Sequence, residues 1–97
     1  MADSLRLDKF LWFARIAKTR ALAQQLAEQG RIRIGGRVAD RAHTPVRVGD
    51  VLAFAQRGAV RVIRVEALPS RRGPAAEARL SYSELPERAL TEEGSRD

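Results

Sequence analysis

The spacing of the apolar residues changes from a helical to a strand period close to residue 30, and this change constrains the fold most. From the seventh residue onward, apolar side chains recur at helical intervals, at Leu7, Phe10, Leu11, Ala14 and Ala17. Residues 31–34 instead alternate arginine and isoleucine, which is the period of a half-buried strand. A chain that changes period in this way is expected to pack helices against a sheet.

Two short helices, joined as an αα-hairpin, are predicted before the change of period. Asp8 lies in the first turn of the first helix, where a carboxylate suits the positive end of the helix dipole. Thr19 can cap the second helix through its hydroxyl, and Gly30 can end it in the left-handed conformation. The second helix carries one narrow apolar stripe, formed by Leu22, Ala23, Leu26 and Ala27. Its alanines would let the two helices approach closely.

Short strands and a last helix are predicted after residue 30. Gly35-Gly36 suits a tight hairpin turn that needs positive φ at both central positions, and residues 37–38 begin the return strand. A loop follows from Pro69 to Gly73, and Pro74 suits the first turn of a short helix that runs to Tyr82. Further strand segments are expected at residues 46–48, 51–55 and 59–67.

These elements define an α+β fold class: an αα-hairpin packed on a small, mostly antiparallel sheet, with a short C-terminal helix. A chain of 97 residues is long enough for one modest core, so we expect a single domain. Its parts are a disordered lead at 1–5, a core at 6–58, an extra strand, basic loop and short helix at 59–85 that complete the same domain, and a polar acidic tail at 86–97.

The surplus positive charge lies entirely in the first half of the chain. Residues 1–49 hold ten Lys/Arg against four Asp/Glu, whereas residues 50–97 hold eight Arg and eight Asp/Glu, which cancel. Such an uneven charge on a foldable segment indicates a surface that binds a polyanion.

The sequence lacks the residues that several kinds of functional site require. There is no cysteine, and His43 is the single histidine, so neither a metal site nor a His-based nucleophile system is expected. No apolar run is longer than the one from Phe10 to Ala14, which is too short for a membrane span. We therefore expect a cytoplasmic protein with no cofactor, no metal, no membrane association and no enzymatic activity.

A patterned set of residues resembles the S4-type RNA-binding domain. The pattern comprises Arg6-Leu7-Asp8, Leu11, Thr19-Arg20, Ala23, Leu26, Gly30, Ile32, Ile34, Gly36 and Val48-Gly49-Asp50. The family has asparagine where this chain has Gly35, and the turn tolerates glycine there. A longer match, which includes residues 71–78 (Arg-Arg-Gly-Pro-Ala-Ala-Glu-Ala) and Tyr82, is similar to the ribosome-associated fifteen-kilodalton heat-shock protein group.

The resemblance implies that the second helix and the following hairpin form one RNA-facing surface. It places Lys18 and Arg20 at the start of that helix, where free N–H groups attract phosphate, and three arginines on the open face of the hairpin. For each arginine the alternative is the solvated side of an amphipathic strand or a loop. The residues expected to bind RNA are Arg6, Lys9, Arg15, Lys18, Thr19, Arg20, Arg31, Arg33, Arg37, Arg71 and Arg72.

Some residues near this surface allow two interpretations. Arg6 can contact RNA or pair with Asp8, and Asp8 itself is expected to be structural. Trp12 can stack on an unpaired base or pack in the core, and the core is favoured because a large aromatic side chain buries much apolar area. His43 is expected in a loop, and Phe10, Phe13 and Phe54 are expected in the core.

The resemblance also implies a function. It predicts a protein that binds ribosomal RNA on free large subunits still holding peptidyl-tRNA, and that returns such stalled particles to use under heat stress. Separately, we expect a monomer. Non-specific binding to tRNA or DNA is also expected. The alternatives are a small DNA-binding regulator of the helix-turn-helix type and an RNA-binding subunit of an RNA-modifying complex.

Overall fold

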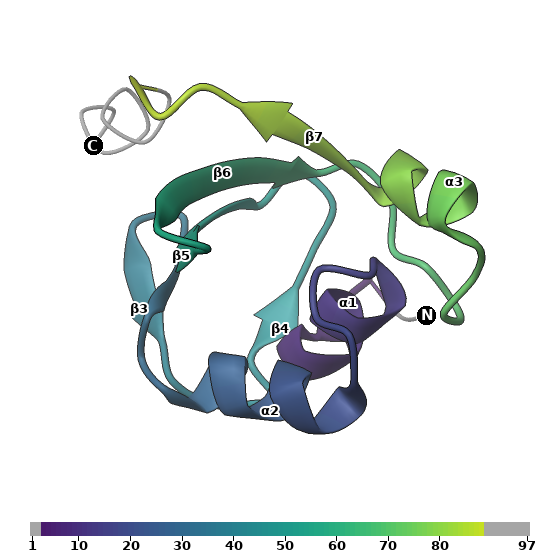
Figure 1. The fold of residues 1–97 in the computed structure, drawn as a ribbon, viewed down its shortest axis with the longest axis horizontal. Coiled ribbons are helices and arrows are strands. Elements are labelled where there is room, and N and C mark those ends of the chain that lie inside the picture. Colours follow the sequence, from purple (N-terminus) through teal and green to yellow (C-terminus); the bar gives the residue numbers. More distant parts are fainter. Residues whose placement is uncertain (1–2, 89–97) are drawn as a thin grey trace.

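Two short helices pack against an antiparallel sheet in the computed structural model, which describes residues 3–88 (Figure 1). The helices of the N-terminal half are α1 (Leu7–Phe13) and α2 (Arg20–Glu28), and a short α3 (Ala75–Ala78) follows the sheet. The strands are β1 (Leu5–Arg6), β2 (Ile32–Ile34), β3 (Arg37–Ala39), β4 (Pro45–Val46), β5 (Val51–Gln56), β6 (Ala59–Val65) and β7 (Tyr82–Leu85). The α+β prediction is confirmed.

The main sheet has the strand order β3-β2-β5-β6-β7, and each neighbouring pair is antiparallel. A second, two-stranded sheet joins β1 to β4, where Leu5 pairs with Val46. The prediction that residues 1–5 form a disordered lead is therefore wrong for Leu5. Leu5 is ordered because its backbone pairs with β4. The local sequence pattern does not predict this long-range pairing.

The first helix begins at Leu7 as predicted but ends at Phe13, earlier than its apolar period suggested. Ala14 and Ala17 remain buried in the segment that leads to α2. Arg15 takes a left-handed conformation with φ of 62°, so the chain turns there and does not continue the helix.

The second helix has the predicted ends. The Thr19 hydroxyl accepts a hydrogen bond from the Leu22 N–H at 3.1 Å, and Gly30 has φ of 72°. Ala23 and Ala27 are fully buried. Leu22, however, is 48% exposed, so the apolar stripe predicted for α2 divides into a buried alanine pair and a more open leucine pair.

The main core lies between the helices and one face of the sheet, and it includes Phe10, Phe54, Leu52 and Ile63. A smaller cluster of Val51, Ala53 and Val62 lies on the opposite face. Phe13 is the exception to the predicted aromatic core. It is half-buried and lies beside the Trp12 ring, with 5.7 Å between the ring centroids.

The C-terminal part of the domain differs from its prediction. The helix expected from Pro74 to Tyr82 ends at Ala78, and one 3₁₀ turn, Arg79–Ser81, leads into strand β7. β7 pairs with β6, with Tyr82 opposite Val65 and Leu85 opposite Val62. Residues 82–85 form a strand because β6 has an open edge with which they pair. Of the predicted acidic tail at 86–97, residues 89–97 lie outside the described part.

The β2–β3 turn yields a first prediction. Gly35 and Gly36 have φ of 59° and 85°, and a Cβ added at either position would meet open space. The cost of a side chain is therefore conformational alone. We expect Gly36→Val to lower the free energy of unfolding by about 1–2 kcal/mol, whereas Gly35→Asn is expected to be neutral because asparagine tolerates the left-handed region. Urea denaturation of the two variants tests this, and equal midpoints would contradict it.

Candidate nucleic-acid interface

The junction of α1 and α2 gathers arginines around one buried carboxylate. Asp8 is fully buried and accepts hydrogen bonds from Arg6 Nε at 3.0 Å, from Arg6 Nη2 at 3.1 Å and from the Lys9 N–H at 2.8 Å. Arg20 Nη2 lies 3.7 Å from Asp8 Oδ2, the oxygen that also accepts from Arg6 Nη2. Asp8 is thus structural, as predicted, and it orients two arginines that both remain more than 40% exposed.

Trp12 links these arginines to the C-terminal loop. The guanidinium carbons of Arg20 and Arg72 lie 5.9 and 6.0 Å from the centroid of its ring. The side chain also packs against the main core and is half-buried. Trp12 therefore serves as a platform for two guanidinium groups. We refer to Arg6, Asp8, Trp12, Arg20 and Arg72 as the junction cluster.

Two predicted RNA contacts also brace the protein itself. Arg72 donates from Nη1 to the Trp12 carbonyl at 3.1 Å and from Nη2 to the Lys18 carbonyl at 3.3 Å. Arg15 Nε donates to the Gly73 carbonyl at 2.6 Å. These bonds hold the loop at residues 69–73 against the helix junction. Arg71, in the same loop, is paired with Glu77 at 3.1 Å and is exposed.

The start of α2 lies beside the junction cluster. Lys18 and Thr19 are exposed there, and the Thr19 hydroxyl caps the helix. The Thr19 hydroxyl accepts the Leu22 N–H, and the other N–H groups of the first turn have no partner within the helix, so an anion is favoured at this end. Lys9 lies on α1 next to Asp8 and is partly exposed.

The prediction placed Arg31, Arg33 and Arg37 on one open face of the hairpin, and it is wrong for Arg37, which does not share a face with Arg33. All three are exposed, but Arg33 pairs with Val38 while Arg37 pairs with Ile34. Directly opposed residues of an antiparallel pair lie on the same face, so Arg33 and Arg37 project from opposite faces. The two-residue Gly35-Gly36 turn sets this register. Arg37 lies on the side that packs against the helices, and Arg33 on the other.

A groove between α2 and the β5–β6 turn contains residues that the sequence prediction missed. Its volume is about 420 Å³, and it is lined by Ile16, Ala17, Lys18, Leu22, Gln25, Leu26, Gln29, Gln56 and Arg57. Arg57 has φ of 55° and precedes Gly58, which has φ of 78°. The Arg-Gly pair between two β-rich runs signals a tight turn in the sequence. Arg57 was not among the residues predicted to bind RNA.

Arg61 supports the wall of this groove. It lies 5.6 and 5.8 Å from the ring centroids of Phe54 and Tyr82, donates to the Gln56 Oε1 at 2.8 Å and is paired with Glu84. Burial alone would lower the pKa of Arg61, but its bonds to the Glu84 carboxylate and Tyr82 outweigh that effect and raise the pKa. Arg61 is therefore a fixed internal cation.

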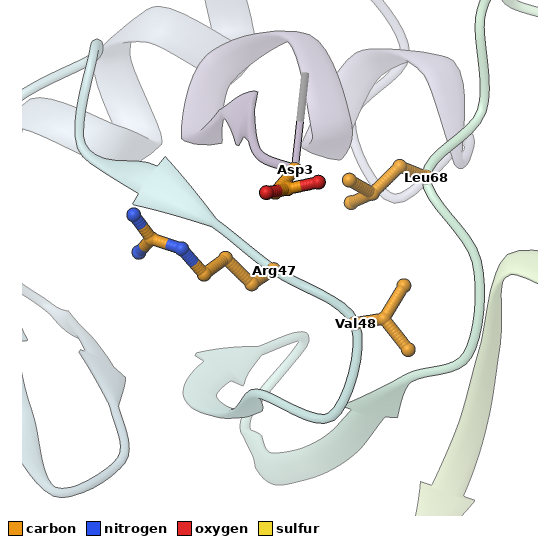
Figure 2. Close-up of a pocket in the computed structure, with 4 residues that line it drawn as sticks. All are labelled: Asp3, Arg47, Val48 and Leu68. Atoms are coloured by element: carbon orange, nitrogen blue, oxygen red, sulfur yellow. The ribbon is translucent and has the colours of Figure 1, made fainter. Parts of the chain in front are cut away.

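Figure 2 shows a second pocket, whose volume is about 410 Å³. It is lined by Asp3, Arg47, Val48 and Leu68. The Asp3 carboxylate in its wall opposes a phosphate ligand. Within residues 3–88, no three His, Cys, Asp or Glu side chains gather so that they could hold a metal ion, and no helix is long and apolar enough to cross a membrane.

Comparison with known proteins gives one family and several relatives. The model of the S4 domain family matches residues 5–52. Heat shock protein 15 of Escherichia coli strain K12 is 38% identical over 86 residues, which cover 89% of this chain and 64% of that protein. The RQC P-site tRNA stabilizing factor of Halalkalibacterium halodurans is 49% identical over 55 residues, which cover 55% of this chain and 61% of that relative.

A solved structure resembles nearly the whole chain. The heat shock protein 15 of Vibrio cholerae, described as trimeric, matches with a TM-score of 0.80 and 32% identity, and the match covers 94% of this chain and 90% of that one. The Escherichia coli relative is longer, since the present chain spans 64% of its length.

Proposed function

This chain belongs to the heat shock protein 15 family of S4-domain proteins, and we propose that it binds ribosomal RNA through the junction cluster and the start of α2. The observation that carries the proposal is the pair of half-exposed guanidinium groups, Arg6 and Arg20, held beside the capped end of a helix. Guanidinium forks and helix N–H groups are both ligands for phosphate oxygens.

The buried carboxylate does not neutralise this surface. Asp8 offers one negative charge to two arginines, and Lys18 and Arg72 add two further cations nearby. The cluster therefore keeps a net positive charge, which favours an anionic ligand.

We propose that the protein acts at large ribosomal subunits that hold peptidyl-tRNA and helps to recycle stalled or dissociated subunits under heat stress. Relatives named heat shock protein 15 and RQC P-site tRNA stabilizing factor support this assignment. We further propose a binding role without catalysis, in the cytoplasm where ribosomes act. A monomer remains our proposal for this chain, although the Vibrio cholerae relative is described as trimeric.

Sedimentation of ribosomes provides the test. We expect the protein to migrate with free large subunits in a density gradient of heat-stressed cells, and to leave them when salt is raised because phosphate contacts weaken with counterion concentration. Recovery only in the soluble top fractions, in stressed and unstressed cells alike, would contradict the proposal. Washing with buffer of constant ionic strength is the control.

The DNA-binding alternative is not favoured. In this chain α2 is followed by strand β2 after three residues, and Arg72 anchors the C-terminal loop across the start of α2. A recognition helix enters the major groove with its N-terminal side chains free to reach base edges. Here the first residue of α2, Arg20, is instead held between Asp8 and Trp12.

A further inference from the structure

The groove between α2 and the β5–β6 turn has an apolar floor beside polar walls. Leu22 and Leu26 are one helical turn apart on the same side of α2, and Ile16 adds to the floor from the preceding segment. Its volume of about 420 Å³ lies within the range of sites for small ligands, about 300–1,000 Å³. Apolar surface of this kind can accept the face of a base that has left its own stack.

The polar lining suits a nucleotide. Gln25 and Gln29, also one turn apart on α2, are exposed at the groove, and each amide offers donors and an acceptor. Among the described residues that line the groove, the two charged ones, Lys18 and Arg57, are both cations. Amides can read the edge of a base, while the cations can hold its phosphates.

The wall of the groove is rigid because Gln56 is bonded at both ends of its amide. Its Nε2 donates to the Ile16 carbonyl at 3.0 Å, and its Oε1 accepts from Arg61 at 2.8 Å. These bonds tie the β5–β6 turn to the segment that precedes α2. A preformed wall reduces the entropy that a ligand would lose in ordering the site.

Arg57 occupies a position that disfavours a long side chain. A left-handed conformation costs a residue other than glycine or asparagine free energy, and hairpin turns usually place Asn, Asp or Gly there. The strain is borne by a cation that lines the groove. This backbone strain, the positive charge of Arg57 and its place in the groove lining together support a role for Arg57 in binding.

We propose that this groove binds one unpaired nucleotide of the RNA, with its base on the leucine floor and its phosphates between Lys18 and Arg57. The inference rests on the proposed RNA-binding function and adds a preference for unpaired RNA to it. Continuity supports the assignment, because Lys18 and Leu22 flank Thr19 and Arg20 at the start of α2. A strand bound at the junction cluster would therefore reach the groove directly.

Binding of two RNA probes tests the groove. One is a hairpin with an unpaired loop that carries 2-aminopurine, and the other is a blunt duplex with the same number of phosphates. We expect the protein to prefer the hairpin and to change the 2-aminopurine fluorescence. The double variant Gln25→Ala with Gln29→Ala should narrow the preference for the hairpin about three- to tenfold, since it removes the proposed hydrogen bonds to the base without changing the charge.

Matched variants make the outcome specific. Gln24→Ala, on the same helix but outside the groove lining, should keep the preference. Arg57→Asn retains the turn but removes a cation from the groove, so it should also narrow the preference for the hairpin over the duplex. If the protein binds both probes equally and the groove variants match Gln24→Ala, the groove inference is overturned and the proposed function stands. If the protein binds neither probe, the proposed function fails as well.

Discussion

Replacing Asp8 with alanine is expected to lower the free energy of unfolding by about 2–3 kcal/mol. Asp8 is fully buried, and its carboxylate joins Arg6, Arg20 and the Lys9 N–H. Removing one partner of a buried ion pair costs about 3–5 kcal/mol, but both arginines are more than 40% exposed and can be rehydrated, which reduces the loss.

Urea denaturation measures this effect, with Asp40→Ala as the control because Asp40 is an exposed acid of the same charge. Asp8→Asn should fall between the two, since its amide oxygen can still accept the Lys9 N–H. An Asp8→Ala protein as stable as Asp40→Ala would mean that the junction cluster does not stabilise the fold.

Arg20→Ala is expected to weaken RNA binding about 10- to 100-fold, the range for losing a charge-assisted hydrogen bond to phosphate. Its side chain is held by Asp8 and Trp12 at the start of α2, so the guanidinium is already positioned for a ligand. Loss of one phosphate contact should also reduce the slope of log affinity against log salt by about one. Titrations at several salt concentrations measure both quantities.

Three comparisons sharpen the Arg20 experiment. Arg20→Lys keeps the charge but loses the planar fork, so its affinity should be intermediate. Arg33→Ala should weaken binding by only about two- to threefold because Arg33 projects from the sheet face turned away from the helices. Arg79→Ala removes an exposed charge of the 3₁₀ turn and should change little. An unchanged salt slope in the Arg20→Ala variant would place the interface elsewhere.

Much of the N-terminal half could be predicted because its structure is determined by neighbours in sequence. The Thr19 cap, the left-handed Gly30 and the Gly35-Gly36 turn each involve residues within a few positions of one another. The family assignment made from the Arg-Leu-Asp and Thr-Arg patterns is confirmed for the same reason, since those patterns lie in this locally specified segment.

The features that were missed depend on contacts between distant segments. β7 forms because β6 offers an open edge, and Leu5 is ordered because β4 lies beside it. The roles of Arg15 and Arg72 as braces follow from carbonyl groups about sixty residues away along the chain. For the candidate RNA contacts as a set, the assignment remains a prediction until binding is measured.

By itself, the sequence determined the start of α1, both ends of α2, the hairpin turn and the excess of positive charge, since these depend on local backbone preferences and on composition. Only the tertiary structure decided which cations lie together. It set Arg20 and Arg72 around Trp12, joined Arg6 and Arg20 through Asp8, separated Arg33 from Arg37 and brought Arg57 to the α2 groove. The reason is that the direction of a charged side chain follows from strand register and from long-range packing, which neighbouring residues do not specify.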